Sequence, residues 1–148
     1  MASSLDLEAT LQAVLESVER LLPSEFLEIT LWDAEAGHLV PYRLVGMTGI
    51  DRRLEKASEP YRPDQGYSGY LITHHKALLV KDVGSFRQAR PAVDRQRYPF
   101  QSYIGVPLML AGELIGTLEL ASLSKDNYTE SDLQVLRLLA GPHMTFGL

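Results

Sequence analysis

The chain has 148 residues, of which 45% are hydrophobic and 22% charged, and this size and balance predict one soluble domain spanning residues 1–148. It contains no cysteine, which excludes disulfides, thiol nucleophiles, thiolate metal sites and thioether-linked cofactors. A formal charge of −5 argues against nucleic acid as a partner, and no apolar run is long enough to span a membrane. The opening MASSLDLEA has neither the basic nor the apolar region of a secretory signal, so we expect a cytoplasmic protein.

Residues 5–22 predict an amphipathic helix, and Pro23 ends it. Six apolar side chains share one face of this helix: Leu7, Leu11, Val14, Leu15, Val18 and Leu22. The stretch FLEITLWD at residues 26–33 then alternates apolar and polar side chains, which is typical of a half-buried strand. A tight AEAG connection leads to a second strand at residues 38–46, so the two strands should form a hairpin.

The middle of the chain is less regular. Residues 47–64 are rich in charge, glycine and proline, and we expect a mobile loop there with one helical turn at residues 52–57. Residues 64–76 predict a short helix entered through glycines, residues 77–83 a short strand, and residues 84–100 a further loop or short helix. The motif GYSG in the short helix lacks the second glycine of a nucleophile elbow, and we assign no catalytic residue.

Residues 102–122, SYIGVPLMLAGELIGTLELAS, predict a β-hairpin whose arms are apolar on both faces. Such an antiparallel pair must be covered on both sides, so helices or a closed pocket should lie over each face. Glu119 interrupts the apolar pattern. It is either a polar group in the floor of a pocket or an ordinary charge at the margin of the sheet.

Residues 128–141 predict a closing helix, with Thr129 as its N-cap and Asp132 in the capping-box position. The helix should end or kink near Ala140, because Gly141 and Pro142 both disfavour its continuation. Together the elements indicate an α+β domain on an antiparallel sheet. Both terminal helices carry more apolar positions than one sheet face requires, which predicts a homodimer through these helices. The surplus positions are Leu5, Leu21, Leu133, Val135, Leu136, Leu138, Leu139 and Ala140.

The order and spacing of four segments resemble the GAF domain over nearly the whole chain. They are GYSGYLITHHKALLVKDV at residues 66–83, the arginine-rich spacer that follows, the hairpin at residues 102–122, and the closing YTESDLQVLRLLA. The resemblance implies a GAF-like fold, related to the PAS and profilin-like folds. In that fold a central antiparallel sheet carries the N- and C-terminal helices on one face, and a ligand pocket with short helices and a lid loop on the other.

GAF domains are mostly regulatory modules of signalling proteins such as two-component histidine kinases, cyclic-nucleotide enzymes and transcription activators. The resemblance therefore implies a sensor that binds a small molecule and works with an output domain such as a kinase, cyclase or transcription regulator. It names no cofactor for this chain. Bilin-binding and methionine-sulfoxide-reducing relatives need cysteines, which this chain lacks, so we expect no enzymatic activity. The alternative is a dimerisation module whose pocket is filled by its own side chains.

Four arginines against one aspartate lie in the spacer at residues 86–98, and guanidinium groups over a pocket would favour a phosphate or carboxylate ligand. A solvated loop face is the plainer interpretation of the same residues. Five aromatic side chains are concentrated around the expected cavity, although core packing alone would explain most of them. The expected ligand-binding residues are Tyr67, Phe86, Arg90, Arg95, Tyr98, Phe100, Tyr103 and Glu119.

Overall fold

The computed structural model describes residues 4–45, 51–53, 59–93, 95–96 and 98–141, which form three helices and six strands. None of the helices in these ranges is long and apolar enough to cross a bilayer. In chain order the elements are α1 (Ser4–Leu21), β1 (Phe26–Asp33), β2 (His38–Val45), β3 (Asp51–Arg53), α2 (Gly66–His74), β4 (Leu78–Val80), β5 (Ser102–Leu110), β6 (Glu113–Ser122) and α3 (Glu130–Ala140).

The six strands pair antiparallel in one sheet with the order β3-β2-β1-β6-β5-β4. The β1–β2 and β5–β6 hairpins meet through β1 and β6 at the centre of the sheet. This central pairing runs from Phe26 opposite Ala121 to Leu31 opposite Gly116. It therefore decides which side chains of the two hairpins share a face.

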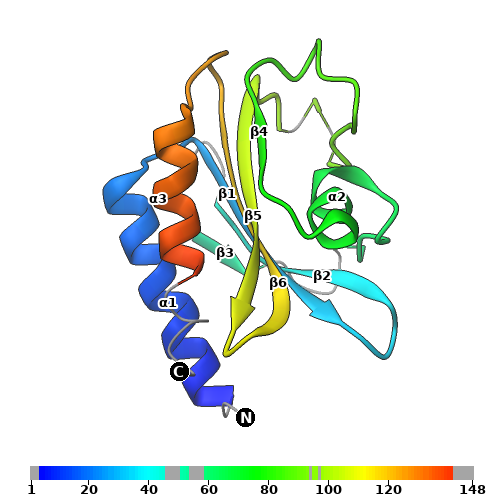
Figure 1. The fold of residues 1–148 in the computed structure, drawn as a ribbon, viewed down its shortest axis with the longest axis vertical. Coiled ribbons are helices and arrows are strands. Elements are labelled where there is room, and N and C mark those ends of the chain that lie inside the picture. Colours follow the sequence, from blue (N-terminus) through cyan, green and yellow to red (C-terminus); the bar gives the residue numbers. More distant parts are fainter. Residues whose placement is uncertain (1–3, 46–50, 54–58, 94, 97, 142–148) are drawn as a thin grey trace.

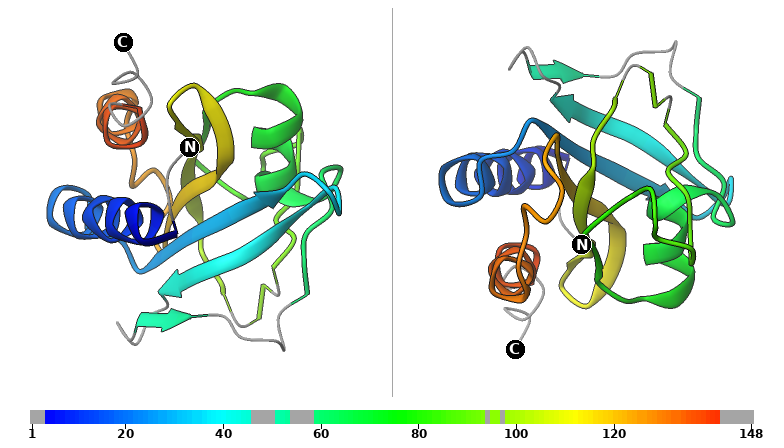
Figure 2. Two further views of the ribbon diagram at one scale, coloured as in Figure 1. Left: turned by 90° about the horizontal axis from the view of Figure 1, so that it is seen from below. Right: turned by 90° about the horizontal axis from the view of Figure 1, so that it is seen from above.

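Both faces of the sheet are covered, as the apolar hairpin predicted. Helices α1 and α3 lie side by side on one face, and α2 lies on the other (Figures 1 and 2). Because side chains alternate along a strand, Leu27 and Ile29 of β1 pack with Leu118 of β6 in the core under α1 and α3. Phe26 and Glu28 lie on the opposite side, which we call the pocket face.

The α+β class and the expected fold are confirmed, with one difference. The helical turn expected at residues 52–57 is wrong at its start, because Asp51–Arg53 form the edge strand β3 paired with β2. A single helical turn orders several residues for one hydrogen bond, whereas pairing with β2 extends an existing ladder. Residues 54–58 lie outside the described residues. Of the alternatives for residues 84–100, the described part is a loop.

Helix α3 begins and ends where its sequence signals predicted. The Thr129 side-chain oxygen accepts from the Asp132 backbone N–H at 3.1 Å, and the Asp132 carboxylate accepts from the Thr129 backbone N–H at 2.9 Å. This reciprocal capping box satisfies two of the free donors at the helix start. The helix ends at Ala140 with Gly141 as its C-cap, and Pro142 lies outside the described residues.

Candidate functional site

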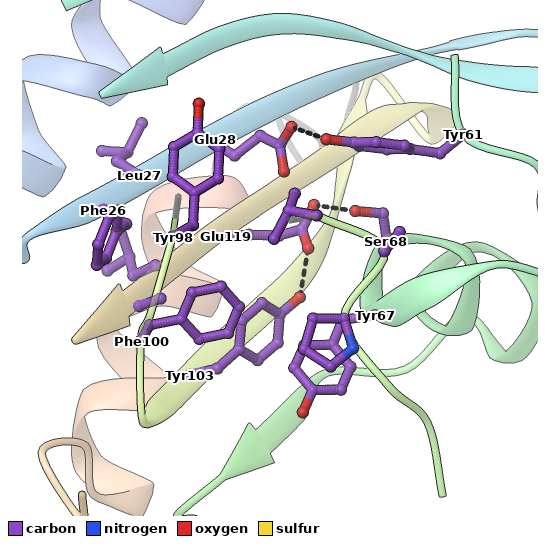
Figure 3. A pocket seen from close by; sticks show the side chains of 15 residues that line it. Phe26, Leu27, Glu28, Tyr61, Tyr67, Ser68, Tyr98, Phe100, Tyr103 and Glu119 are labelled. Atoms are coloured by element: carbon purple, nitrogen blue, oxygen red, sulfur yellow. Dashed lines mark hydrogen bonds between the residues drawn. The ribbon is translucent and has the colours of Figure 1, made fainter. Parts of the chain in front are cut away.

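A cavity of about 50 Å³ lies between the pocket face of the sheet and the segment that includes α2 (Figure 3). About 10–15 Å³ of such space holds one water molecule, so the cavity has room for a few water-sized groups. Strands β1, β5 and β6 form its floor, while α2 and nearby loops form its walls. The lining residues are Phe26, Leu27, Glu28, Tyr61, Tyr67, Ser68, Pro91, Ala92, Val93, Tyr98, Phe100, Tyr103, Glu119, Leu120 and Ala121.

Two glutamates lie next to each other in the floor of the cavity. Glu28 on β1 and Glu119 on β6 are direct cross-strand partners, and both side chains point to the pocket face (Figure 3). They are only 9% and 4% exposed. Like charges directly opposite each other destabilise a sheet, and buried charges are costly unless they are compensated. The fold therefore has to supply this carboxyl pair with partners.

Three hydroxyl groups donate hydrogen bonds to the Glu119 carboxylate. Tyr103 Oη lies 2.5 Å from Oε1, while Ser68 Oγ and Thr117 Oγ1 lie 2.7 and 2.6 Å from Oε2. Thr117 Oγ1 is also 2.6 Å from Thr30 Oγ1, and because Thr117 donates to Glu119, Thr30 donates to Thr117. Burial raises the pKa of Glu119, and the three donors oppose that rise because they favour the ionised carboxylate.

Glu28 has fewer hydrogen-bond donors than Glu119. Tyr61 Oη donates to Oε2 at 2.8 Å, whereas Oε1 points into the cavity and has no hydrogen-bond partner among the described residues (Figure 3). Burial and the neighbouring charge of Glu119 raise the pKa of Glu28 to about 8. Of the two carboxyl groups, Glu28 keeps its proton more readily, because three donors favour the ionised form of Glu119 and one donor favours that of Glu28.

The Tyr103 phenol reaches Glu119 by passing over Gly105. Gly105 is the cross-strand partner of Glu119, and a Cβ atom on it would lie 2.2 Å from Tyr103 Oη. A glycine inside a strand weakens that strand, but here it leaves the space that the phenol occupies. Burial and the charge of Glu119 raise the pKa of Tyr103, so the phenol keeps its proton and remains a donor at neutral pH.

Helix α2 and the loop that carries Ala92 close the cavity. Gly66 begins α2 with a φ of +72°, and a Cβ atom on it would lie 2.6 Å from that of Ala92. Tyr67 on α2 packs edge-on against Phe86 and tilted against Tyr103, with ring centroids 6.0 and 4.5 Å apart. The Tyr67 hydroxyl is buried without a hydrogen-bond partner among the described residues, and burial raises its pKa to about 12.

Arg90 and Arg95, the two arginines expected in a lid, have different surroundings, and neither lines the cavity. Arg95 donates from Nη1 to the Tyr98 carbonyl oxygen at 2.9 Å, and its guanidinium carbon lies 4.6 Å from the centre of the Phe100 ring. Arg90 is exposed and lines a separate surface groove beside α2. Arg95 therefore contacts a backbone carbonyl and an aromatic ring of the protein itself, whereas Arg90 lies at the surface.

The cavity brings together most of the residues expected to bind a ligand. Phe86 lies behind Tyr67 and outside the lining. Of the two alternatives for Glu119, the structure places it in the pocket floor. The expected residues that line the cavity are Tyr67, Tyr98, Phe100, Tyr103 and Glu119.

Several lining residues were not expected from the sequence, among them Phe26, Glu28, Tyr61 and Ser68. A signal for the first two was present, because the period of two in FLEITLWD places Phe26, Glu28 and Thr30 on one face. Tyr61 follows the irregular segment, and it is held beside the sheet by two backbone hydrogen bonds of 2.8 Å with Leu39. No local sequence pattern predicts such an isolated bridge.

The free energy of unfolding should fall as the pH rises from about 5 to about 8 because of Glu28. The pKa of this group is raised from 4.5 to about 8 on folding, so between these values the folded state holds a proton that the unfolded state has lost. Raising the pH removes that proton and destabilises the folded chain, by up to about 1.4 kcal/mol per pH unit.

Urea denaturation of wild type and of Glu28→Gln across this pH range measures the effect. The stability of the variant relative to wild type should increase with pH, because the amide has no proton to lose. Glu113→Gln, at the exposed start of the same strand as Glu119, is the matched control. A stability difference between Glu28→Gln and wild type that does not change with pH would contradict this titration.

Gly105→Ala should push the Tyr103 phenol away from Glu119 and destabilise the fold by about 1–3 kcal/mol, as overpacking of a filled core does. Gly84→Ala is the control, because the nearest atom to its added Cβ lies at an ordinary 3.4 Å. Thermal unfolding compares the two variants. Equal melting temperatures would show that the phenol does not need the space above Gly105.

Comparisons with known proteins agree with the fold that the four sequence segments predicted. The family model for the GAF domain matches residues 4–142. The structure is similar to residues 122 to 287 of a methyl-accepting chemotaxis protein, with a TM-score of 0.73 and 19% identity over 96% of this chain and 88% of that one. It is also similar to the GAF domain/HD domain protein from Geobacter sulfurreducens, with a TM-score of 0.69 and 13% identity over 96% and 92% of the two chains.

A third similar structure is an enzyme. The free methionine-R-sulfoxide reductase from Neisseria meningitidis, in complex with its substrate, has a TM-score of 0.67 and 17% identity over 99% of this chain and 92% of that one. At these identities, the likenesses show the fold alone. The match of the family model over nearly all of the sequence shows that this chain belongs to the GAF domain family.

Proposed function

We propose that this chain is the regulatory sensor domain of a signal-transduction protein and that it binds a small molecule in the cavity above Glu28 and Glu119. The observation that supports this function is Glu28 Oε1, a carboxyl oxygen of a buried glutamate that faces the cavity without a hydrogen-bond partner among the described residues. Apolar residues at the two positions would relieve the fold of a costly carboxyl pair. Stability alone therefore does not explain the carboxyl pair, whereas a ligand that forms a hydrogen bond with Glu28 Oε1 would.

The family supports the signalling part of this proposal. GAF domains occur in signalling proteins, and the similar structures include part of a chemotaxis protein and a GAF domain/HD domain protein. We therefore propose that residues 1–148 form one domain that regulates an output domain such as a kinase, a cyclase or a transcription regulator. The proposed binding residues are those that line the cavity, with Arg95 and Phe86 supporting Phe100 and Tyr67 from outside.

The side chains of the cavity favour binding over catalysis. Ser68, the hydroxyl of the GYSG motif, is buried and donates to Glu119, and no histidine is among the described residues that line the cavity. The serine therefore has no imidazole base of the kind that activates a nucleophilic serine. The sulfoxide reductases share the fold at 17–18% identity, and this chain has none of the cysteines on which such chemistry depends.

Native mass spectrometry of the purified chain tests for ligand binding. We expect a retained mass that disappears on denaturation, and Val93→Phe should lose it because the larger ring fills the cavity that Val93 lines. Val40→Phe is the matched control, since Val40 is exposed on β2. A wild-type chain that retains no mass, and whose melting temperature no member of a metabolite library changes, would contradict ligand binding and favour a dimerisation module.

A second role, dimerisation through the terminal helices, is favoured by exposed apolar side chains. Leu138 on α3 and Leu21 on α1 are 65% and 52% exposed, and the two helices lie side by side on the same face of the sheet (Figure 2). Their neighbours Leu133, Leu136 and Ala140 are buried in the core, so these do not contribute to the surplus. We propose that the exposed leucines pack against a second copy of the chain.

Sedimentation velocity should show a dimer at tens of micromolar protein. Leu138→Lys should shift it to a monomer, because a charged side chain in an apolar contact must be desolvated. Leu123→Lys provides the control, since Leu123 is also exposed but lies after β6, outside both helices. A wild-type monomer at that concentration would rule out this interface.

A further inference from the structure

The charges that line the cavity are of one sign. Its described residues include two carboxyl groups and no lysine, arginine or histidine. Glu28 and Glu119 form no ion pair with any described basic side chain. A buried carboxyl pair without a cation of its own is stabilised by any positive group that enters beside it.

Aromatic rings surround this carboxyl pair. Figure 3 shows Tyr98, Phe100 and Tyr103 to one side of the carboxylates and Tyr61 to the other. The Phe26 ring packs edge-on against Tyr98 and Phe100, with centroids 5.9 and 6.0 Å apart. The faces of aromatic rings attract cations that come within about 6 Å of the ring centre. The Arg95 guanidinium already lies 4.6 Å from the centre of the Phe100 ring. The other rings and the carboxyl pair favour the same charge in a ligand.

The open carboxyl oxygen adds a directional requirement. When Glu28 is ionised, its Oε1 accepts hydrogen bonds and cannot donate them, so a ligand that meets this form must be a donor. The cavity of about 50 Å³ has room for a compact head group and a few carbon atoms. A ligand that fits must therefore be small where it meets Glu28, positively charged and able to donate.

We infer that the cavity binds a small organic cation whose ammonium or amidinium group donates a hydrogen bond to Glu28 Oε1 and lies against the aromatic rings. This inference rests on the proposed ligand-sensing function. A metal ion fits less well, because the described residues contain no group of three or more histidine, aspartate or glutamate side chains that could hold one. An anion, which the arginine-rich spacer favoured, would meet Glu28 and Glu119.

Binding of the cation is coupled to the loss of a proton. The titratable groups that face Glu28 are the carboxyl group of Glu119 and the phenols of Tyr61, Tyr98 and Tyr103. Because the pKa of Glu28 is about 8, a cation that needs its ionised form displaces a proton below that pH. The dissociation constant should then fall about tenfold for each pH unit between about pH 6 and pH 7, while an alkylammonium probe stays charged.

Three probes with the same carbon chain separate the charge of the ligand from its size. Butylammonium, butanol and butyrate are titrated into the isotope-labelled 148-residue chain, and binding is followed through the amide resonances of the lining residues. Butylammonium should bind with a dissociation constant of about a millimolar, as befits so small a ligand, and the other two should bind at least tenfold more weakly.

Two variants and a pH series complete the test. Glu28→Gln should weaken butylammonium binding at least tenfold and remove its pH dependence, whereas Glu113→Gln should change neither. The pH series on wild type needs no variant. If butanol or butyrate binds as tightly as butylammonium, or if the affinity does not change with pH, the cationic assignment is overturned and the sensor function stands. If no probe shifts the pocket resonances, the assignment is again overturned, and the retained-mass experiment decides the sensor function separately.

Discussion

The contact between two buried carboxyl groups at the centre of the sheet constrains everything around it. Glu28 and Glu119 cannot separate without breaking the β1–β6 pairing that joins the two hairpins. The surrounding elements must therefore bring hydroxyl groups to them, and each donor comes from a different place: Ser68 from α2, Tyr103 from β5, Thr117 from β6 and Tyr61 from the loop before α2. The pair thereby fixes the positions of the walls of the cavity.

The two faces of the sheet divide stability from the proposed binding of a ligand. The face under α1 and α3 buries aliphatic side chains such as Ile29, Leu118 and Leu120, each of which contributes about 1.5–3 kcal/mol when fully buried. On the pocket face, polar groups that include Glu28 and Glu119 take the place of some apolar side chains. This face therefore gains less free energy from hydrophobic burial. The aliphatic face offsets the destabilisation that the carboxyl pair brings, and the period of two along each strand keeps the two roles apart.

The sequence predicted the fold more completely than the site because the fold depends on local signals. The capping box at Thr129 and the two-sided apolar hairpin are readable from neighbouring residues, and both are confirmed. Glu28 becomes a pocket residue only when β1 pairs with β6, a contact between residues far apart in the chain. The position of Tyr61 depends on an isolated bridge to Leu39, which no local sequence pattern predicts. The anionic ligand was one of two interpretations of the arginine-rich spacer, and the positions of Arg90 and Arg95 outside the cavity lining are visible only in the structure.

The strands that carry the carboxyl pair also lead directly to the terminal helices. The Tyr128 hydroxyl, just before α3, donates to Ser24 Oγ at 2.6 Å, and Ser24 lies between α1 and β1. Glu25 accepts from the Ser122 hydroxyl at 3.0 Å and from the Leu123 backbone N–H at 2.8 Å, which joins the ends of β1 and β6. Such continuity is not itself coupling, which requires two states that a ligand distinguishes. The protonated and ionised forms of Glu28 are two states that the proposed cation would distinguish, and any effect of that change on the helices would have to pass through these contacts at the ends of β1 and β6.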